Sequence, residues 1–443
     1  MNRFIVDKSF LISSYSPLIT LLSVLICSPN FPLIVIDFVI AVLLGLAFAV
    51  VIYNTFLNSS EHSSVDYLNN LNTKKYLKYA IPLSIISVLS FRQHDYIYYL
   101  RQWKIILDNK DPWIETSNAY GPIHNIFAPL ISINPMIPKL IFFIIYFYAL
   151  YVVTFKEFNF DSDLNTNKKL ILFILYGFCP FSVLTVIVYG NNDALSAALM
   201  ALSLTTLLKS NSKKENFFSG VLLGISSMIK FYPLIISPAF FWRKRTIDYN
   251  FLKGFVLSIL TICLASYKVW GSTILTPILF ATDRSSKHLS FFNFVRSTLS
   301  IDLDHLSIYL VVIVFVASVL FTQLLEFDLI PSVLFLFGSV LSVYKVGHPQ
   351  FFIFFFCLGP LIVRYVSSMR INRNHNLIFS YTSWISFLNF YLIIYHLTCG
   401  MREGASELLR QNGSIIYITI SIILLSFIIR GVLIKPKLFT SIK

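Results

Sequence analysis

Long apolar blocks separated by short polar segments make up most of the chain. The blocks are about 15 to 24 residues long, which suits helices that cross a hydrocarbon core of about 30 Å, and they lack the strict alternation of barrel strands. The pattern therefore predicts an all-α polytopic membrane protein with roughly 12 to 14 transmembrane helices. We expect residues 1–443 to form a single transmembrane domain, in which residues 1–76 are an N-terminal hairpin of spans.

A proline interrupts the apolar pattern in the middle of the chain. Pro233 splits a pair of apolar blocks near residues 217–230 and 232–242. Proline and polar backbone at membrane depth are tolerated only where they line a protein cavity. This segment is therefore expected to form two half-helices or a re-entrant hairpin beside a cavity.

Composition supports the membrane assignment. The chain is 56% hydrophobic and 13% charged, whereas an ordinary globular domain is about 25% charged, and its mean hydropathy is +0.73. The net charge of +14 is explained by basic residues at the cytoplasmic ends of spans, so nucleic-acid binding is not expected. The five cysteines show no CxxC or His/Cys spacing, which argues against a disulfide framework and a thiolate metal site.

The basic residues also predict an orientation. With a cytoplasmic N-terminus, most of the 35 Lys and Arg fall inside, as the positive-inside rule requires. Two long polar loops, residues 91–138 and 271–305, then lie outside. We expect an integral multi-pass protein of a bacterial inner (plasma) membrane, with these two loops on the extracytoplasmic side. The second loop carries Arg284, Lys287 and His288, and it is either a lid, an acceptor surface or a plain solvated connector.

The first external loop, residues 91–138, is the longest polar interruption, and it is expected to contain short helices. Asp95 stands at its start, directly after an apolar span. A carboxylate at the mouth of a transmembrane helix is costly if it faces lipid, so it should face a cavity or the water boundary. The alternative is an ordinary interfacial loop whose Tyr and Trp residues form an aromatic belt.

Polar residues cluster at the external ends of four separate spans. We expect one extracytoplasmic cavity to hold all of these clusters. Carboxylate, amide, cation and imidazole groups together match the needs of group transfer from a phosphate-linked donor, with a general base for a hydroxyl proton and cations for the departing phosphate. The clusters are His94 with Asp95, Asn191 to Asp193, Lys230 with Tyr232, and Lys345 with His348 and Gln350.

Five segments carry a family resemblance. They are an Asp-Tyr-aromatic loop after an early span, then DPW followed by YGP, then YGNNDALSAALMALSL, then GISSMIKFYPLIISP, and finally GHPQFFIFFFCLGPL. In this order the chain resembles the GT-C superfamily of integral-membrane glycosyltransferases over residues 91–138, 186–240 and 343–362. Within it, the chain is most similar to the catalytic subunit of GPI mannosyltransferase I and to bacterial polyprenyl-phosphate-mannose-dependent mannosyltransferases.

The resemblance implies a multi-spanning helical fold, an extracytoplasmic active site, a polyprenyl-phosphate sugar as donor, and inversion at the anomeric carbon. It also implies an early loop Asp as catalytic base, which is Asp95 here. The eukaryotic relative carries a DxD pattern, whereas this chain has Gln93-His94-Asp95. A divalent metal is therefore not indicated, and no cofactor is expected.

The remaining site residues are assigned by type. Lys230, His348 and Arg101 are expected to bind the donor phosphate in place of a metal. The structural alternatives are a helix cap for Asp95, a lysine that snorkels to the interface for Lys230, and a hydrogen-bonded pair that holds the break before Pro349. Asn192 and Asp193 would then only N-cap the span that follows, and aromatic-belt or loop-packing roles would explain Tyr120, Glu115 and Arg101. The residues expected to bind substrate are His94, Glu115, Tyr120, Asn192, Asp193, Tyr232 and Gln350.

The sequence thus favours an inverting hexosyltransferase that uses a polyprenyl-phosphate sugar, with mannose suggested by the resemblance. The acceptor, whether glycolipid, glycan or protein, stays open, as does the oligomeric state. The main alternative is a secondary transporter or a lipid-linked-sugar flippase, which predicts ionisable residues through the depth of the bilayer. A structural membrane scaffold, which needs no clustering of ionisable residues, is a third possibility. Clustering of these residues at one surface favours the transferase.

Overall fold

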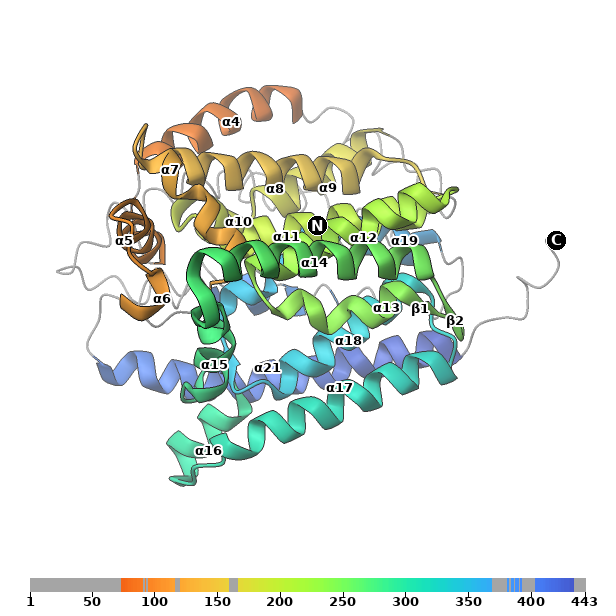
Figure 1. The fold of residues 1–443 in the computed structure, drawn as a ribbon. Helices are drawn as coiled ribbons and strands as arrows, with labels where there is room; N and C mark the ends of the chain where they lie inside the picture. Colours follow the sequence, from red (N-terminus) through yellow and green to blue (C-terminus); the bar gives the residue numbers. More distant parts are fainter. Residues whose placement is uncertain are drawn as a thin grey trace.

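The computed structural model describes residues 73–90, 92, 95–115, 120–158, 166–368, 381, 384–385, 387–389, 391–392 and 403–433. Within these ranges the chain consists of helices, many of them running side by side, with two small two-stranded sheets (Figure 1). The all-α class predicted from the sequence is confirmed. The predicted hairpin of spans at residues 1–76 lies outside the described residues, apart from the start of the first described helix.

The described elements come in the following order along the chain. Through the first half they are α4 (Thr73–Ser90), α5 (Asp95–Leu107), α6 (Pro112–Glu115), η1 (Pro122–Phe127), α7 (Ala128–Ile131), α8 (Ile137–Phe155), α9 (Thr166–Gly177), α10 (Pro180–Ser182), η2 (Val183–Val188), α11 (Asn192–Lys209), α12 (Lys213–Ile229), η3 (Tyr232–Ile236) and α13 (Ser237–Phe241). They continue with β1 (Trp242–Arg243), β2 (Thr246–Ile247), α14 (Tyr249–Trp270), η4 (Gly271–Leu275), α15 (Thr276–Asp283), β3 (Lys287–His288), α16 (Phe291–Leu299), η5 (Asp304–Leu306), α17 (Ser307–Leu324), α18 (Leu329–Val343), β4 (Val346–Gly347), η6 (Pro349–Phe352), α19 (Ile353–Ser368) and α21 (Glu403–Leu433).

Several of these helices are long and apolar enough to cross a membrane. Within the described ranges there are four, and the bent pair Thr166–Gly177 and Pro180–Val188, at 49°, makes a fifth. The chain is therefore a polytopic membrane protein, and the figure of 12 to 14 crossings stays a prediction. The four helices are Ile137–Phe155, Tyr249–Asp283, Asp304–Leu324 and Pro349–Val366.

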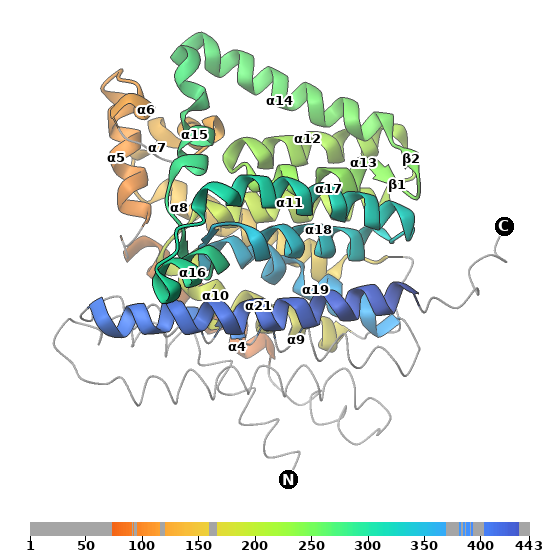
Figure 2. The ribbon, with the colours of Figure 1, turned by 90° about the horizontal axis from the view of Figure 1, so that it is seen from below.

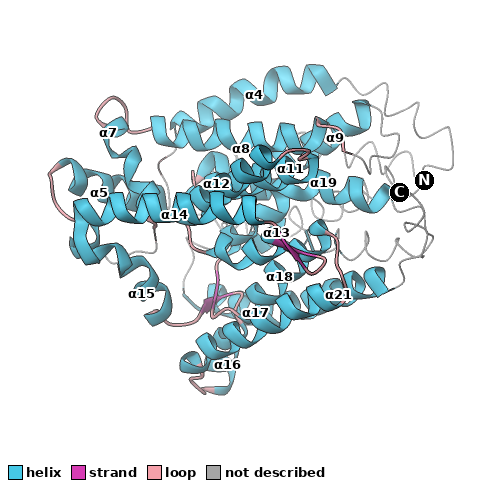
Figure 3. Ribbon diagram, turned by 45° about the vertical axis from the view of Figure 1, so that its right-hand side comes forward, coloured by secondary structure: helices cyan, strands magenta, loops and turns pink. Residues whose placement is uncertain are grey.

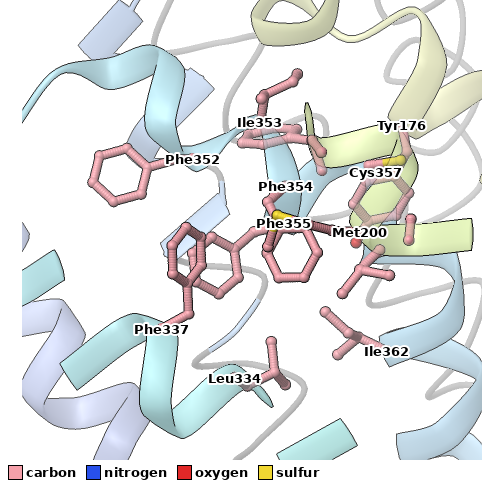
Figure 4. Close-up of a cluster of buried hydrophobic side chains, with 14 of the residues drawn as sticks. Tyr176, Met200, Leu334, Phe337, Phe352, Ile353, Phe354, Phe355, Cys357 and Ile362 are labelled. Carbon is pink, nitrogen blue, oxygen red and sulfur yellow. The ribbon is translucent and has the colours of Figure 1, made fainter. Parts of the chain in front are cut away.

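The helices differ sharply in burial, so that some lie at the centre of the bundle and others on its outside. In the span Pro349–Val366, 94% of the residues are buried. In the most apolar 18-residue stretch of Tyr249–Asp283 only 17% are buried, and this helix exposes leucines such as Leu260 and Leu264. Side chains from α19 pack with Tyr176 of α9, Met200 of α11 and Phe337 of α18 at the centre of the core (Figure 4). The apolar exposed faces of the outer helices suit contact with lipid rather than water.

Helices α11, α12 and α14 pack closely through small residues. A Cβ on Gly220 of α12 would come within 2.1 Å of the Phe251 carbonyl oxygen of α14, so only glycine permits this approach. Between α11 and α12, the hydroxyls of Ser203 and Ser219 lie 3.0 Å apart, and those of Ser196 and Ser226 also lie 3.0 Å apart. These interhelical hydrogen bonds fix the start of α11 beside the end of α12.

The polar segments gather at one end of the bundle. Helices α5, α6, α15 and α16 lie at the left end in Figures 1 and 2, and the β1–β2 hairpin lies at the opposite end. Strands β3 and β4 form the second sheet, which is parallel and is drawn in magenta in Figure 3 near α15. The two segments predicted as long external loops therefore contain short helices and share one end of the molecule.

Candidate active site

A cavity of about 880 Å³ lies at the end of the bundle that carries α5 and α15. Its walls come from α5, the end of α12, η3, α15, the end of α18 and η6, segments that are far apart in the sequence. The structure brings most of the predicted site residues together here. Those that line the cavity are Asp95, Arg101, Tyr120, Lys230, Tyr232, His348 and Gln350.

Helix α5 positions Asp95. Its aromatic residues Tyr96, Tyr99 and Trp103 are fully buried and pack in one cluster against side chains of α8, α11 and α12, so they do not form the aromatic belt of the alternative interpretation. Asp95 is the first residue of this anchored helix, where the helix dipole favours a carboxylate. Gln350 Nε2 donates a hydrogen bond to Asp95 Oδ2 at 3.3 Å, which ties the HPQ segment to α5.

Lys230 caps the end of α12 at the proline break predicted from the sequence. Its ammonium lies 3.4 Å from Asp193 Oδ2 and 4.7 Å from the centre of the Tyr120 ring. Asp193 is wholly buried in the first turn of α11, and Tyr232 donates a hydrogen bond to its carbonyl oxygen. Lys230 therefore faces the protein cavity rather than snorkelling to an interface, and Asp193 balances its charge from behind the cavity wall.

The Tyr120-Gly121 pair docks directly on the end of α12. Gly121 N donates to the carbonyl oxygen of Ile229 at 2.9 Å, and a Cβ on Gly121 would lie 2.2 Å from the carbonyl oxygen of Met228. Only glycine allows two backbones to approach so closely. This contact holds the Tyr120 ring over the ammonium of Lys230.

Asn192 does not line the cavity. Its Oδ1 accepts a hydrogen bond from the Tyr99 hydroxyl at 3.0 Å, and its Nδ2 donates to His124 Nδ1, 3.1 Å away. Burial, reinforced by Lys230, lowers the pKa of His124 well below its usual range, which keeps the ring neutral. Asn192 thus connects α11 to the long polar segment of residues 91–138. Asn191 takes the N-cap position of α11 but makes no side-chain cap.

His94 and the side chain of Glu115 lie outside the described residues. Their predicted roles as substrate-binding residues stay predictions.

Residues 271–305, the second long polar segment, supply cavity residues that the sequence interpretation did not assign. Arg284 and Lys287 both line the cavity, so this segment is part of the site wall and not a plain solvated connector. The charged residues between Asp283 and His288 were the sequence feature that could have indicated this role. The neighbouring sequence, however, does not show which part of the protein this segment packs against.

The β3–β4 pairing explains how Arg284 and Lys287 reach the site. Lys287 N donates to the Lys345 carbonyl oxygen at 3.0 Å, and Leu289 N donates to that of Gly347 at 3.2 Å. Lys345 Nζ donates to the carbonyl oxygen of Thr282. A Cβ on Gly347 would lie 2.4 Å from the Leu289 backbone, so the close pairing requires glycine.

The cavity is strongly basic. Among the described residues, its lining includes four cationic side chains, Arg101, Lys230, Arg284 and Lys287, and one carboxylate, Asp95. His348 adds no charge at neutral pH, because burial and its neighbours His288 and Arg284 lower its pKa well below the usual range. Among the residues that the structure describes, no group of three His, Cys, Asp or Glu side chains is arranged to hold a metal ion. The arrangement suits an anionic ligand beside a single base.

The sequence model of glycosyltransferase family 87 matches residues 120–344, just over half of the chain. The chain belongs to glycosyltransferase family 87. A search of curated proteins finds no match. The family 87 match includes Tyr120, Lys230 and Arg284, whereas Asp95 and His348 lie outside it and join the same cavity through the fold.

Membership of family 87 shows that the protein is a glycosyltransferase, and it therefore has a sugar donor and an acceptor. The cavity is the candidate for their meeting place, because it combines a carboxylate with several cations. Both are needed where a hydroxyl loses a proton as an anionic group departs.

Proposed function

We propose that this family 87 member is an inverting hexosyltransferase of the GT-C type that moves a sugar from a polyprenyl-phosphate donor to an acceptor hydroxyl. One observation carries the proposal: Asp95 shares a cavity of about 880 Å³ with Arg101, Lys230, Arg284 and Lys287. The resemblance of the HPQF and KFYP segments to polyprenyl-phosphate-mannose-dependent enzymes, including the GPI mannosyltransferase I subunit, makes mannose the first sugar to test.

In this mechanism Asp95 is the general base. Its carboxylate takes the proton of the acceptor hydroxyl while the oxygen attacks the anomeric carbon. The bond from that carbon to the phosphate oxygen breaks, and the phosphate leaves with the electron pair. A single displacement of this kind inverts the anomeric configuration. Gln350 holds the Asp95 carboxylate through the 3.3 Å hydrogen bond to Oδ2.

The cations stabilise the leaving group. The phosphate of a polyprenyl-phosphate sugar carries one negative charge and gains a second as the bond breaks, so fixed positive groups favour the transition state over the ground state. Arg101, Arg284 and Lys287 line the cavity for this role, and Lys230 is held in place by Asp193 and Tyr120. We therefore propose transfer without a metal cofactor.

Part of the cavity wall suits a lipid donor. Beside the charged groups, several apolar side chains line the space, and a polyprenyl chain requires such a surface. An acceptor on a glycolipid, a glycan or a protein would enter from the open side. The apolar lining residues are Phe231, Ile235, Phe280, Leu341 and Phe351.

The distribution of basic residues between the two ends of the bundle supports a proposed side of the membrane for the cavity. Arg243, Lys244 and Arg245 lie at the β1–β2 hairpin, at the end opposite the cavity. Because basic residues mark the cytoplasmic side, the cavity would open on the extracytoplasmic side, and we propose a bacterial inner membrane. These features support a transferase at the membrane surface rather than a transporter with a midplane site.

Discharge of a defined donor tests this function. Purified protein in lipid nanodiscs is incubated with radiolabelled polyprenyl-phosphate mannose and a membrane lipid extract, and the products are separated by thin-layer chromatography. We expect label to move from the donor to a new product of inverted configuration. GDP-mannose should give no product under the same conditions. Use of the nucleotide sugar alone, or no discharge of either donor or of the matching glucose donor, would refute the proposal.

A further inference from the structure

A second, smaller pocket of about 100 Å³ adjoins the cavity. Asp95, His348 and Gln350 line both spaces, so they stand at the junction between them. The lining of the small pocket, as far as the structure describes it, includes no lysine or arginine. A phosphate is therefore not favoured in it. Its other polar side chains come from Thr185, Tyr189, Asn191 and His288.

Two buried polar atoms of this pocket lack a partner among the described residues. Thr185 Oγ1 and Asn191 Oδ1 are both shielded from solvent and make no hydrogen bond there. Most buried polar atoms in proteins are hydrogen-bonded, and an orphaned one costs stability, so a pair in one small pocket requires an explanation. Ligand hydroxyls would satisfy both atoms.

The local backbone explains why these residues reach the pocket. Thr185 lies in η2, a π-helix, and Asn191 N donates to the Thr185 carbonyl oxygen at 3.0 Å across the turn at Gly190. Gly190 has a φ of 62°, which favours glycine. Single π-helical turns are frequent at functional sites because they change the direction of side chains within a helix.

The size of the pocket limits what it can hold. A water molecule takes about 30 Å³ of liquid, so the pocket has room for a few hydroxyl-sized groups. That is the polar edge of one sugar ring, and it is too small for a glycan, a glycolipid headgroup with its chain, or a protein segment. The donor hexose is the one substrate part that must lie next to both the phosphate site and Asp95.

We infer that Thr185 and Asn191 form a donor-sugar subsite, in which their side-chain oxygens hydrogen-bond hydroxyl groups on the polar edge of the transferred hexose. This assignment rests on the proposed function. The phosphate lies among the cations of the main cavity, the ring edge lies in the small pocket, and the anomeric carbon lies at the junction beside Asp95. The subsite thereby selects among donor sugars.

Thr185→Val tests the subsite, because it keeps the shape and removes only the orphaned hydroxyl. In the free protein this change removes an unsatisfied buried atom, so the thermal midpoint should stay equal or rise. With polyprenyl-phosphate mannose, kcat/KM should fall by about tenfold, the value of one hydrogen bond. Thr205→Val is the matched control: Thr205 is buried in α11 and donates to the Leu202 carbonyl oxygen, so this variant should lose some stability and keep its kinetics.

A series of monodeoxy donors identifies the contact. For the donor that lacks the hydroxyl bound by Thr185, wild type and Thr185→Val should give the same kcat/KM, while the tenfold gap persists for the other donors. A gap that persists with every deoxy donor, a rise in acceptor KM alone, or unchanged kinetics of Thr185→Val would overturn the subsite while leaving the transferase intact. Absence of donor discharge by wild type would instead remove the proposed function itself.

Discussion

Asp95→Asn separates the chemistry of the site from its architecture. The substitution removes the charge and the basicity of the side chain but keeps its shape. Asn Oδ1 can still accept the hydrogen bond that Gln350 Nε2 donates to Asp95 Oδ2 at 3.3 Å. Replacing a bond to a charged acceptor by a neutral one costs about 1 kcal/mol, so the variant should fold with a small change in thermal midpoint.

The effect on catalysis should be far larger. A positioned general base contributes typically about 10²- to 10⁴-fold, which corresponds to roughly 3 to 5 kcal/mol of activation free energy. We therefore expect kcat for polyprenyl-phosphate mannose to fall by two to four orders of magnitude. Donor binding should be retained or strengthened, because Asn no longer repels the phosphate while Arg101, Lys230, Arg284 and Lys287 are untouched.

The assay follows single-turnover discharge of radiolabelled donor, together with donor affinity from equilibrium binding in detergent. Asp108→Asn is the matched control, since Asp108 is exposed just beyond the end of α5 and should behave as wild type. If Asp95→Asn turns over within a few-fold of wild type, Asp95 is not the base. If it loses donor binding in proportion to its rate, Asp95 instead binds the donor.

Three further predictions concern the framework of the site. Lys230→Met should destabilise the protein by about 3 to 5 kcal/mol, because it leaves the buried Asp193 carboxylate unpaired. The double variant Lys230→Met with Asp193→Asn should recover the stability but not the donor affinity. Chemical denaturation measures the stability, and equilibrium donor binding measures the affinity. Because the pKa of His124 is depressed in the folded protein, the unfolded chain binds more protons than the folded protein below about pH 6.5, and His124 should lower the free energy of unfolding by up to about 1.4 kcal/mol for each unit that the pH falls. His348, whose pKa is also depressed, adds to this slope, so His124→Asn should reduce the slope without abolishing it in thermal melts between pH 7.5 and 5. Gly121→Ala should lower the free energy of unfolding by about 1 to 3 kcal/mol and raise the donor KM, since its Cβ would lie 2.2 Å from a backbone carbonyl oxygen of α12. Gly338→Ala, whose Cβ would have its nearest contact at 3.4 Å, should leave the stability unchanged in the same melts. Equal stability of the two glycine variants would contradict the docking of Gly121.

Local features of the sequence were sufficient for the fold class and for part of the site. The length of an apolar block is a local property, so the all-α membrane class and the break at Pro233 follow from the sequence alone. The positive-inside rule then predicts one shared side for Asp95, Lys230 and His348. These three residues line one cavity, whereas the fourth predicted cluster, Asn191 to Asp193, does not line it, and the chemical roles of all these residues stay proposals.

Tertiary packing decided the rest. Arg284 enters the cavity wall because β3 pairs with β4, a strand some 60 residues later in the chain, and no local pattern predicts that pairing. Asn192 turns toward Tyr99 and His124, while its neighbour Asp193 pairs with Lys230. The length of an apolar block determines which segment of the chain crosses the membrane. The direction of a polar side chain at the end of that helix depends instead on the other segments that pack against it.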